Sequence, residues 1–148
     1  MNKLVKLVML VFVALLIHGC KQKLEDVSSA ESFKKLIGKE FYTTKPLRIH
    51  GITMDTNYRK VIDHYTLTKE PGMSGPEVVF SSSVPVGAIV NINKVLQCSN
   101  CIFGSPIAIQ VDLNIEGLQK ESPVLLYGLR VTNDDGTISI DPSFFDEK

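Results

Sequence analysis

The sequence lacks any run of basic residues beyond its amino terminus. The chain contains 16 lysines and arginines and 16 aspartates and glutamates, and residues 1–19 hold two of the lysines and no acidic residue. Residues 20–148 therefore have a formal net charge of −2. This balance argues against the positive surface that nucleic-acid binding requires. The sequence also has no internal repeat, and its length favours one domain over residues 29–148.

A paired nucleophile and base are also missing from the sequence. After residue 20 the histidines are His50 and His64. We expect both to be solvent-facing strand residues, with a metal or acid–base role through Asp63 or Asp55 as the alternative. If the two strands that carry the histidines pair with each other, their register decides whether both histidines lie on one face. They do so when the numbers of two paired residues add to an even sum. The sequence leaves this register open. We therefore expect a non-enzymatic protein with no catalytic residue, no metal site and no cofactor.

The segment PGMSGP, residues 71–76, is rich in residues that favour turns. Its serine misses the G-x-S-x-G spacing of a nucleophile elbow by one residue, and no strand-to-helix change surrounds it. Because binding residues are often carried by loops on a rigid scaffold, we interpret Met73, Ser74 and Gly75 as a candidate binding loop.

A second turn-rich segment, residues 133–136, has the composition NDDG of a calcium-binding loop. Aligning Gly136 with the glycine of such a loop places Val131 at the first ligand position and Pro142 at the last. Neither side chain carries an oxygen, so this segment predicts a hairpin turn.

Long apolar runs are confined to the amino terminus. Leu7 to Ile17 form an uncharged core that follows Lys3 and Lys6. As a helix this core would be about 16 Å long. It is shorter than the ~20 residues of a membrane span and has the length of a signal-peptide core. The alternative is a short transmembrane anchor that begins at Leu4.

The residues Ile17-His18-Gly19-Cys20, which end this run, resemble the lipobox of bacterial lipoproteins. Ile17, Gly19 and Cys20 match that motif, whereas His18 stands where a small residue is usual. The resemblance covers the first twenty residues alone. It implies that residues 1–19 are a signal peptide and that Cys20 becomes acylated. Two or more acyl chains would hold the protein stably in a lipid bilayer.

The residues after Cys20 suggest where the anchored protein would lie. In enteric-type bacteria an aspartate directly after the cysteine retains a lipoprotein at the inner membrane. Lys21 therefore favours the outer membrane, with the protein facing the periplasm. Residues 20–28 are interpreted as the lipidated cysteine and a short polar tether.

The chain has three cysteines. If Cys20 carries lipid, as the resemblance implies, Cys98 and Cys101 remain as a pair in an oxidising compartment. The residues between them favour a tight turn whose ends lie within disulfide reach. We expect a structural disulfide. The alternative is a redox pair of thioredoxin type, but that chemistry needs a helix after the first cysteine, and residues 102–106, IFGSP, are a poor helix start.

Most of the remaining chain alternates apolar and polar residues, most clearly from Ile107 to Ile115, as expected for half-buried strands. We predict strands at residues 41–52, 58–70, 77–81, 86–98, 107–115, 124–131 and 137–140. One short helix is predicted over residues 29–37, with Ser28 and Glu31 as its capping box. The fold class is mainly β: a small barrel of SH3-like or OB-like form, or a compact sandwich, with one short N-terminal helix.

These features together predict a lipid-anchored protein of the bacterial envelope. We expect a binding or structural module for a protein or cell-wall partner near the membrane, of which an inhibitor or immunity-type lipoprotein is one variety. The alternative is an envelope enzyme or thiol–disulfide redox factor that uses Cys98 and Cys101.

Overall fold

The computed structural model describes residues 23–101 and 106–148. The predicted signal peptide, the lipobox and Cys20 lie outside the described residues. The elements in chain order are β1 (Lys23–Asp26), α2 (Glu31–Lys34), β2 (Glu40–Thr43), β3 (Leu47–Ile52), β4 (His64–Lys69), β5 (Val78–Val84), β6 (Ile89–Ser99), β7 (Ile107–Leu113), β8 (Val124–Leu126), β9 (Arg130–Thr132), β10 (Ile138–Ile140) and β11 (Phe145–Glu147).

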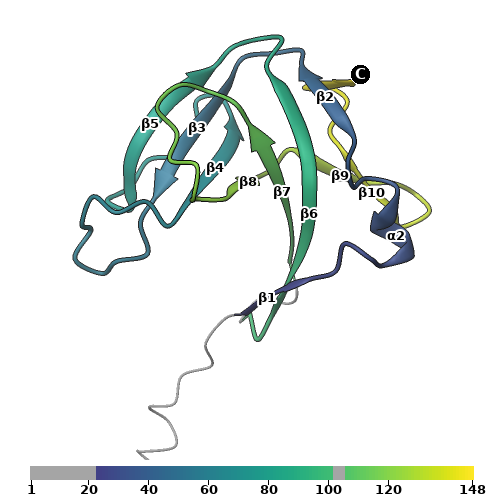
Figure 1. Cartoon of the computed structure of the whole chain (residues 1–148), viewed down its shortest axis with the longest axis horizontal. Helices are drawn as coiled ribbons and strands as arrows, with labels where there is room; N and C mark the ends of the chain where they lie inside the picture. Colours follow the sequence, from purple (N-terminus) through teal and green to yellow (C-terminus); the bar gives the residue numbers. More distant parts are fainter. Residues whose placement is uncertain (1–22, 102–105) are drawn as a thin grey trace, which may run out of the picture.

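Nine strands form one mixed sheet in the order β11-β2-β6-β7-β8-β4-β3-β5, and β1 pairs with β6 beside this path. Strand β8 runs parallel to β4, whereas the other pairs are antiparallel. Strands β9 and β10 form a separate hairpin. The predicted mainly β class with one short helix is confirmed. Within the described residues the sheet is curved but does not close into a barrel, since β11 and β5 are its edges (Figure 1).

The core lies on one face of the curved sheet. The alternation predicted for residues 107–115 places Ile109 and Val111 in this core, while Gln110 and Asp112 point to the other face. The largest fully buried side chain is Tyr65 of β4. Its ring meets Phe80 edge-on, with ring centres 5.8 Å apart, and thereby holds β5 against the core.

Three of the predicted strands differ substantially from the structure. The strand predicted at 124–131 is two strands, β8 and β9, which belong to different sheets. The strand predicted at 41–52 is two strands, β2 and β3, because the chain breaks at Pro46, whose nitrogen cannot donate to a ladder. The strand predicted at 58–70 begins only at His64. Residues 53–63 are instead an irregular connection, which projects from the end of the sheet at the lower left of Figure 1.

The helix is shorter than predicted. It spans Glu31–Lys34, and its N-cap residue Ala30 has no side-chain cap. The predicted capping box does not form, because the Ser28 hydroxyl accepts a hydrogen bond from the backbone N–H of Val95 in β6, at 2.9 Å. Ser28 therefore fixes the segment after β1 to the sheet and does not cap the helix. Residues 23–26, which were interpreted as part of a polar tether, form strand β1 and pair with β6.

The predicted hairpin around residues 133–136 is confirmed: β9 and β10 pair through Thr132 and Ile138. The carboxyl terminus also belongs to the sheet. Phe145 is buried and pairs with Thr43, which joins β11 to β2.

Candidate binding surfaces

Residues 70–77, here called the strap, connect two strands that lie on opposite sides of β3. Both β4 and β5 are antiparallel to β3. Strand β4 ends with Lys69 opposite Leu47, whereas β5 begins with Val78 opposite Ile52. The strap must therefore run along the length of β3, over the face of the sheet that is turned away from the core. The candidate binding loop Met73, Ser74 and Gly75 is the middle of this strap, with Met73 half-buried and the other two residues exposed.

His50 of β3 holds the strap in place. Its side chain is only 2% exposed, so the expectation of a solvent-facing histidine is wrong for this residue. The His50 Nε2 atom accepts a hydrogen bond from the backbone N–H of Met73 at 3.1 Å. Nε2 is therefore unprotonated, and the proton on Nδ1 can be donated to the Ser81 hydroxyl, 3.1 Å away. Burial lowers the pKa of His50, and the nearby charge of Arg48 lowers this pKa further.

Gly72, directly before Met73, packs beside the His50 ring. Its φ angle is +92°, in the region that favours glycine. A Cβ atom placed there would lie 2.3 Å from Nε2 of His50. Glycine at this position is thus required both by the backbone conformation and by the contact.

The two histidines lie on one face but not in one site. The register pairs His50 with Thr66 and Ile52 with His64, and the even sum places both histidines on the face away from the core. His64 is half-buried, and it lines a cleft beside the cysteine pair. Within residues 23–101 and 106–148, no group of three or more His, Cys, Asp or Glu side chains is arranged to hold a metal ion.

Asp63 and Asp55, which were considered as metal or acid–base partners of the histidines, instead accept hydrogen bonds from the backbone of residues 53–63. The Asp63 carboxylate accepts a hydrogen bond from the backbone N–H of Met54 at 2.6 Å. Asp55 accepts one from the N–H of Asn57 at 2.8 Å, and its carboxylate also pairs with Arg59 at 2.6 Å. Both aspartates thus brace the same connection.

This braced connection exposes three large apolar side chains. Met54 is 69% exposed, Tyr58 50% and Val61 59%. We call this set the apolar loop. The Thr53 N–H donates to the carbonyl oxygen of Glu77 at 2.9 Å, which ties the loop to the end of the strap. Tyr58 and Val61 were missed from the sequence because the pattern of residues 58–70 placed them in a strand that directly follows the turn Asp55-Thr56-Asn57, whereas β4 begins only at His64.

Cys98 and Cys101 form a disulfide, with Cα atoms 5.9 Å apart. Cys98 is 4% exposed and lies in strand β6. This placement differs from a redox pair, whose first cysteine stands exposed at a helix N-terminus. A cleft of about 710 Å³ opens beside the disulfide, and its lining includes Leu125, Tyr127 and Arg130.

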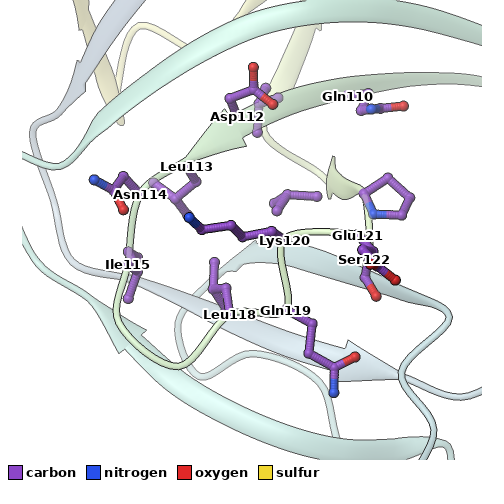
Figure 2. A pocket seen from close by; sticks show the side chains of 13 residues that line it. Gln110, Asp112, Leu113, Asn114, Ile115, Leu118, Gln119, Lys120, Glu121 and Ser122 are labelled. Carbon is purple, nitrogen blue, oxygen red and sulfur yellow. The ribbon is translucent and has the colours of Figure 1, made fainter.

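A second cleft, of about 380 Å³, is formed by the connection between β7 and β8 (Figure 2). The side chain of Lys120 extends across it towards Leu113 and Asn114. The backbone N–H of Gln119 donates to the Tyr65 hydroxyl at 3.0 Å, so this connection is fixed to the core. The cleft is thus bounded largely by its own connection, with a lysine side chain lying across it.

The chain matches no protein-family model, no curated protein and no solved structure. Among the helices of the described residues, none is long and apolar enough to span a membrane.

Proposed function

We propose that the protein is a lipid-anchored, non-enzymatic binding module of the bacterial envelope. Its anchor would be the acylated Cys20, and its partner a protein or cell-wall component near the membrane. The similarity of residues 17–20 to a lipobox supports the anchor. The observation that carries the binding role is the exposure of the apolar loop.

The apolar loop has the properties of an interface centre. Tyrosine is enriched among the residues that contribute most to protein–protein affinity, and methionine is enriched in interfaces generally. Soluble proteins often expose single apolar side chains, but three exposed on one short connection offer apolar area that a partner would cover. The hydrogen bonds of Asp63 and Asp55 restrain the backbone of the loop, which reduces the conformational entropy that would be lost on binding. We therefore favour a protein partner.

Tyr58 is expected to lie at the interface with this partner. A photoreactive phenylalanine analogue placed at position 58 of the full-length chain, expressed in its native host, should form a covalent adduct with one envelope protein. Mass spectrometry of the adduct identifies that protein. Replacing both Met54 and Val61 with serine in the same chain should reduce the adduct yield several-fold, since the apolar contact is lost.

Tyr127 provides a matched control. It is 64% exposed, more than Tyr58, and it bonds through its N–H to Leu67, towards the end of β4 away from the apolar loop. The analogue at position 127 should not yield the same adduct. Equal adducts at both positions, or none at position 58, would contradict the proposed binding surface.

A further inference from the structure

The strands at the two ends of the sheet order, β11 and β5, differ in length and in charge. Strand β11 has three residues, and ion pairs flank it: Lys39 with Glu147 and Lys148 with Glu40, each at 2.6 Å. Strand β5 has seven residues, VVFSSSV, without a charge or a proline. Natural proteins usually protect an edge strand by shortening it, charging it or interrupting it with proline, because unpaired backbone groups attract other strands. Strand β5 has a bulge at Val79, where its register against β3 shifts, but from Phe80 to Val84 it has none of these protections.

The backbone groups on the free side of β5 can be identified from the ladder. The Thr53 N–H donates towards β5, to Glu77, whereas the carbonyl oxygen of Ile52 accepts from Asp63 on the β4 side. Because the N–H and C=O groups of successive residues point to opposite sides of a strand, those of Leu47, Ile49 and Gly51 also point towards β5. Their partners are Val84, Ser82 and Phe80.

It follows that Ser81 and Ser83 direct their N–H and C=O groups away from β3. Among the described residues, no backbone hydrogen bond outside the β3 ladder reaches Val79 to Val84. The free edge of β5 therefore presents a row of unpaired donors and acceptors.

The free edge is also held in a fixed geometry. The Arg48 guanidinium donates to the hydroxyl groups of Ser81 and Ser83, each at 3.1 Å. On the core side, Phe80 packs against Tyr65 and Val84 is fully buried. From Phe80 to Val84, where the register against β3 is regular, an incoming strand would thus meet an extended template.

We infer that β5 pairs antiparallel with β5 of a second copy of this chain, about a two-fold axis at Ser81. In this register Ser81 stands opposite its counterpart, and Phe80 stands opposite Ser82 of the second copy. The outward-facing N–H and C=O groups then satisfy each other across the axis. A second copy suits this edge because the paired side chains are all uncharged, so no like charges meet in the ladder. The inference is independent of the proposed partner at the apolar loop.

Cysteine cross-linking in native membranes tests both the pairing and its register. In the proposed ladder the Cα atoms of two opposed residues at position 81 lie about 5.5 Å apart, within the range that a disulfide bridges. Full-length Ser81→Cys should therefore form a covalent dimer on oxidation with copper phenanthroline. Full-length Ser83→Cys is the matched control, because its two copies would lie about 14 Å apart along the strands. The dimer yield should be several-fold higher at position 81 than at position 83.

The wild-type chain provides a second measurement. Hydrogen–deuterium exchange of the peptide containing residues 78–84 should slow as the protein concentration rises, because the amides of Ser81 and Ser83 become paired. Adding Ser83→Pro to Ser81→Cys removes one outward N–H and should reduce the dimer yield. Equal yields at positions 81 and 83, an adduct of position 81 with a different protein, or exchange that does not depend on concentration would overturn the inference.

Discussion

Replacing Gly72 with alanine is expected to destabilise the fold by about 2–5 kcal/mol. One part of this cost is conformational, since the φ angle of +92° is unfavourable for a residue with a Cβ atom. The other part is steric, because the new Cβ would lie 2.3 Å from Nε2 of buried His50. Urea unfolding of the purified full-length chain, followed by circular dichroism, measures the loss.

Two further variants separate these contributions. Gly136 has a φ angle of +79°, and no atom lies within 4 Å of the position that a Cβ would take there, so Gly136→Ala should cost only the conformational part, about 1–2 kcal/mol. In a His50→Ala background, Gly72→Ala should likewise cost less than in the wild type, because the two residues are coupled. If Gly72→Ala and Gly136→Ala cost the same, the strap does not pack on His50 as described.

Acidification from pH 7 to pH 5 is expected to lower the free energy of unfolding more in the wild type than in His50→Gln. Protonation of His50 would place a second N–H opposite the N–H of Met73 and abolish the bond that holds the strap. Burial lowers the pKa of His50 below its value in the unfolded chain, about 6.5, so the unfolded chain binds more protons. The stabilisation is complete above that pH and is lost as the pH falls through the folded-state pKa, with a slope of at most about 1.4 kcal/mol per pH unit.

His50→Gln retains an oxygen that can accept from Met73 but does not titrate in this range. His64, whose pKa is also lowered by burial, is present in both chains, so its contribution cancels in the comparison. Urea unfolding at pH 7, 6 and 5 gives the two curves. Parallel curves would show that protonation of His50 is not coupled to the strap.

The parts of the fold that were predictable from sequence are those that depend on local pattern. The alternation at residues 107–115 predicts a half-buried strand, and the turn residues 133–136 predict a hairpin. Both predictions depend only on residues that are close in the sequence. Ser28 shows where local pattern fails. Its spacing to Glu31 is typical of a capping box, but Val95, which is 67 residues away in the sequence, donates to its hydroxyl instead.

The candidate surfaces were only partly predictable for the same reason. The segment around Met73 could be identified as a loop from its prolines and glycines. That it crosses β3 and is bonded to His50 follows from strand order, which no local signal encodes. The exposure of Tyr58 was missed because its neighbours also fit a strand pattern, and only the register of β4, which starts at His64, excludes it.

The central claim, that this is a lipid-anchored envelope protein, is tested most directly by mass spectrometry of the amino-terminal peptide purified from native membranes. We expect a peptide that begins at Cys20 and carries a diacylglyceryl group on its thiol and a third acyl chain on its amine. A free thiol at Cys20, or residues 1–19 still attached, would contradict the claim.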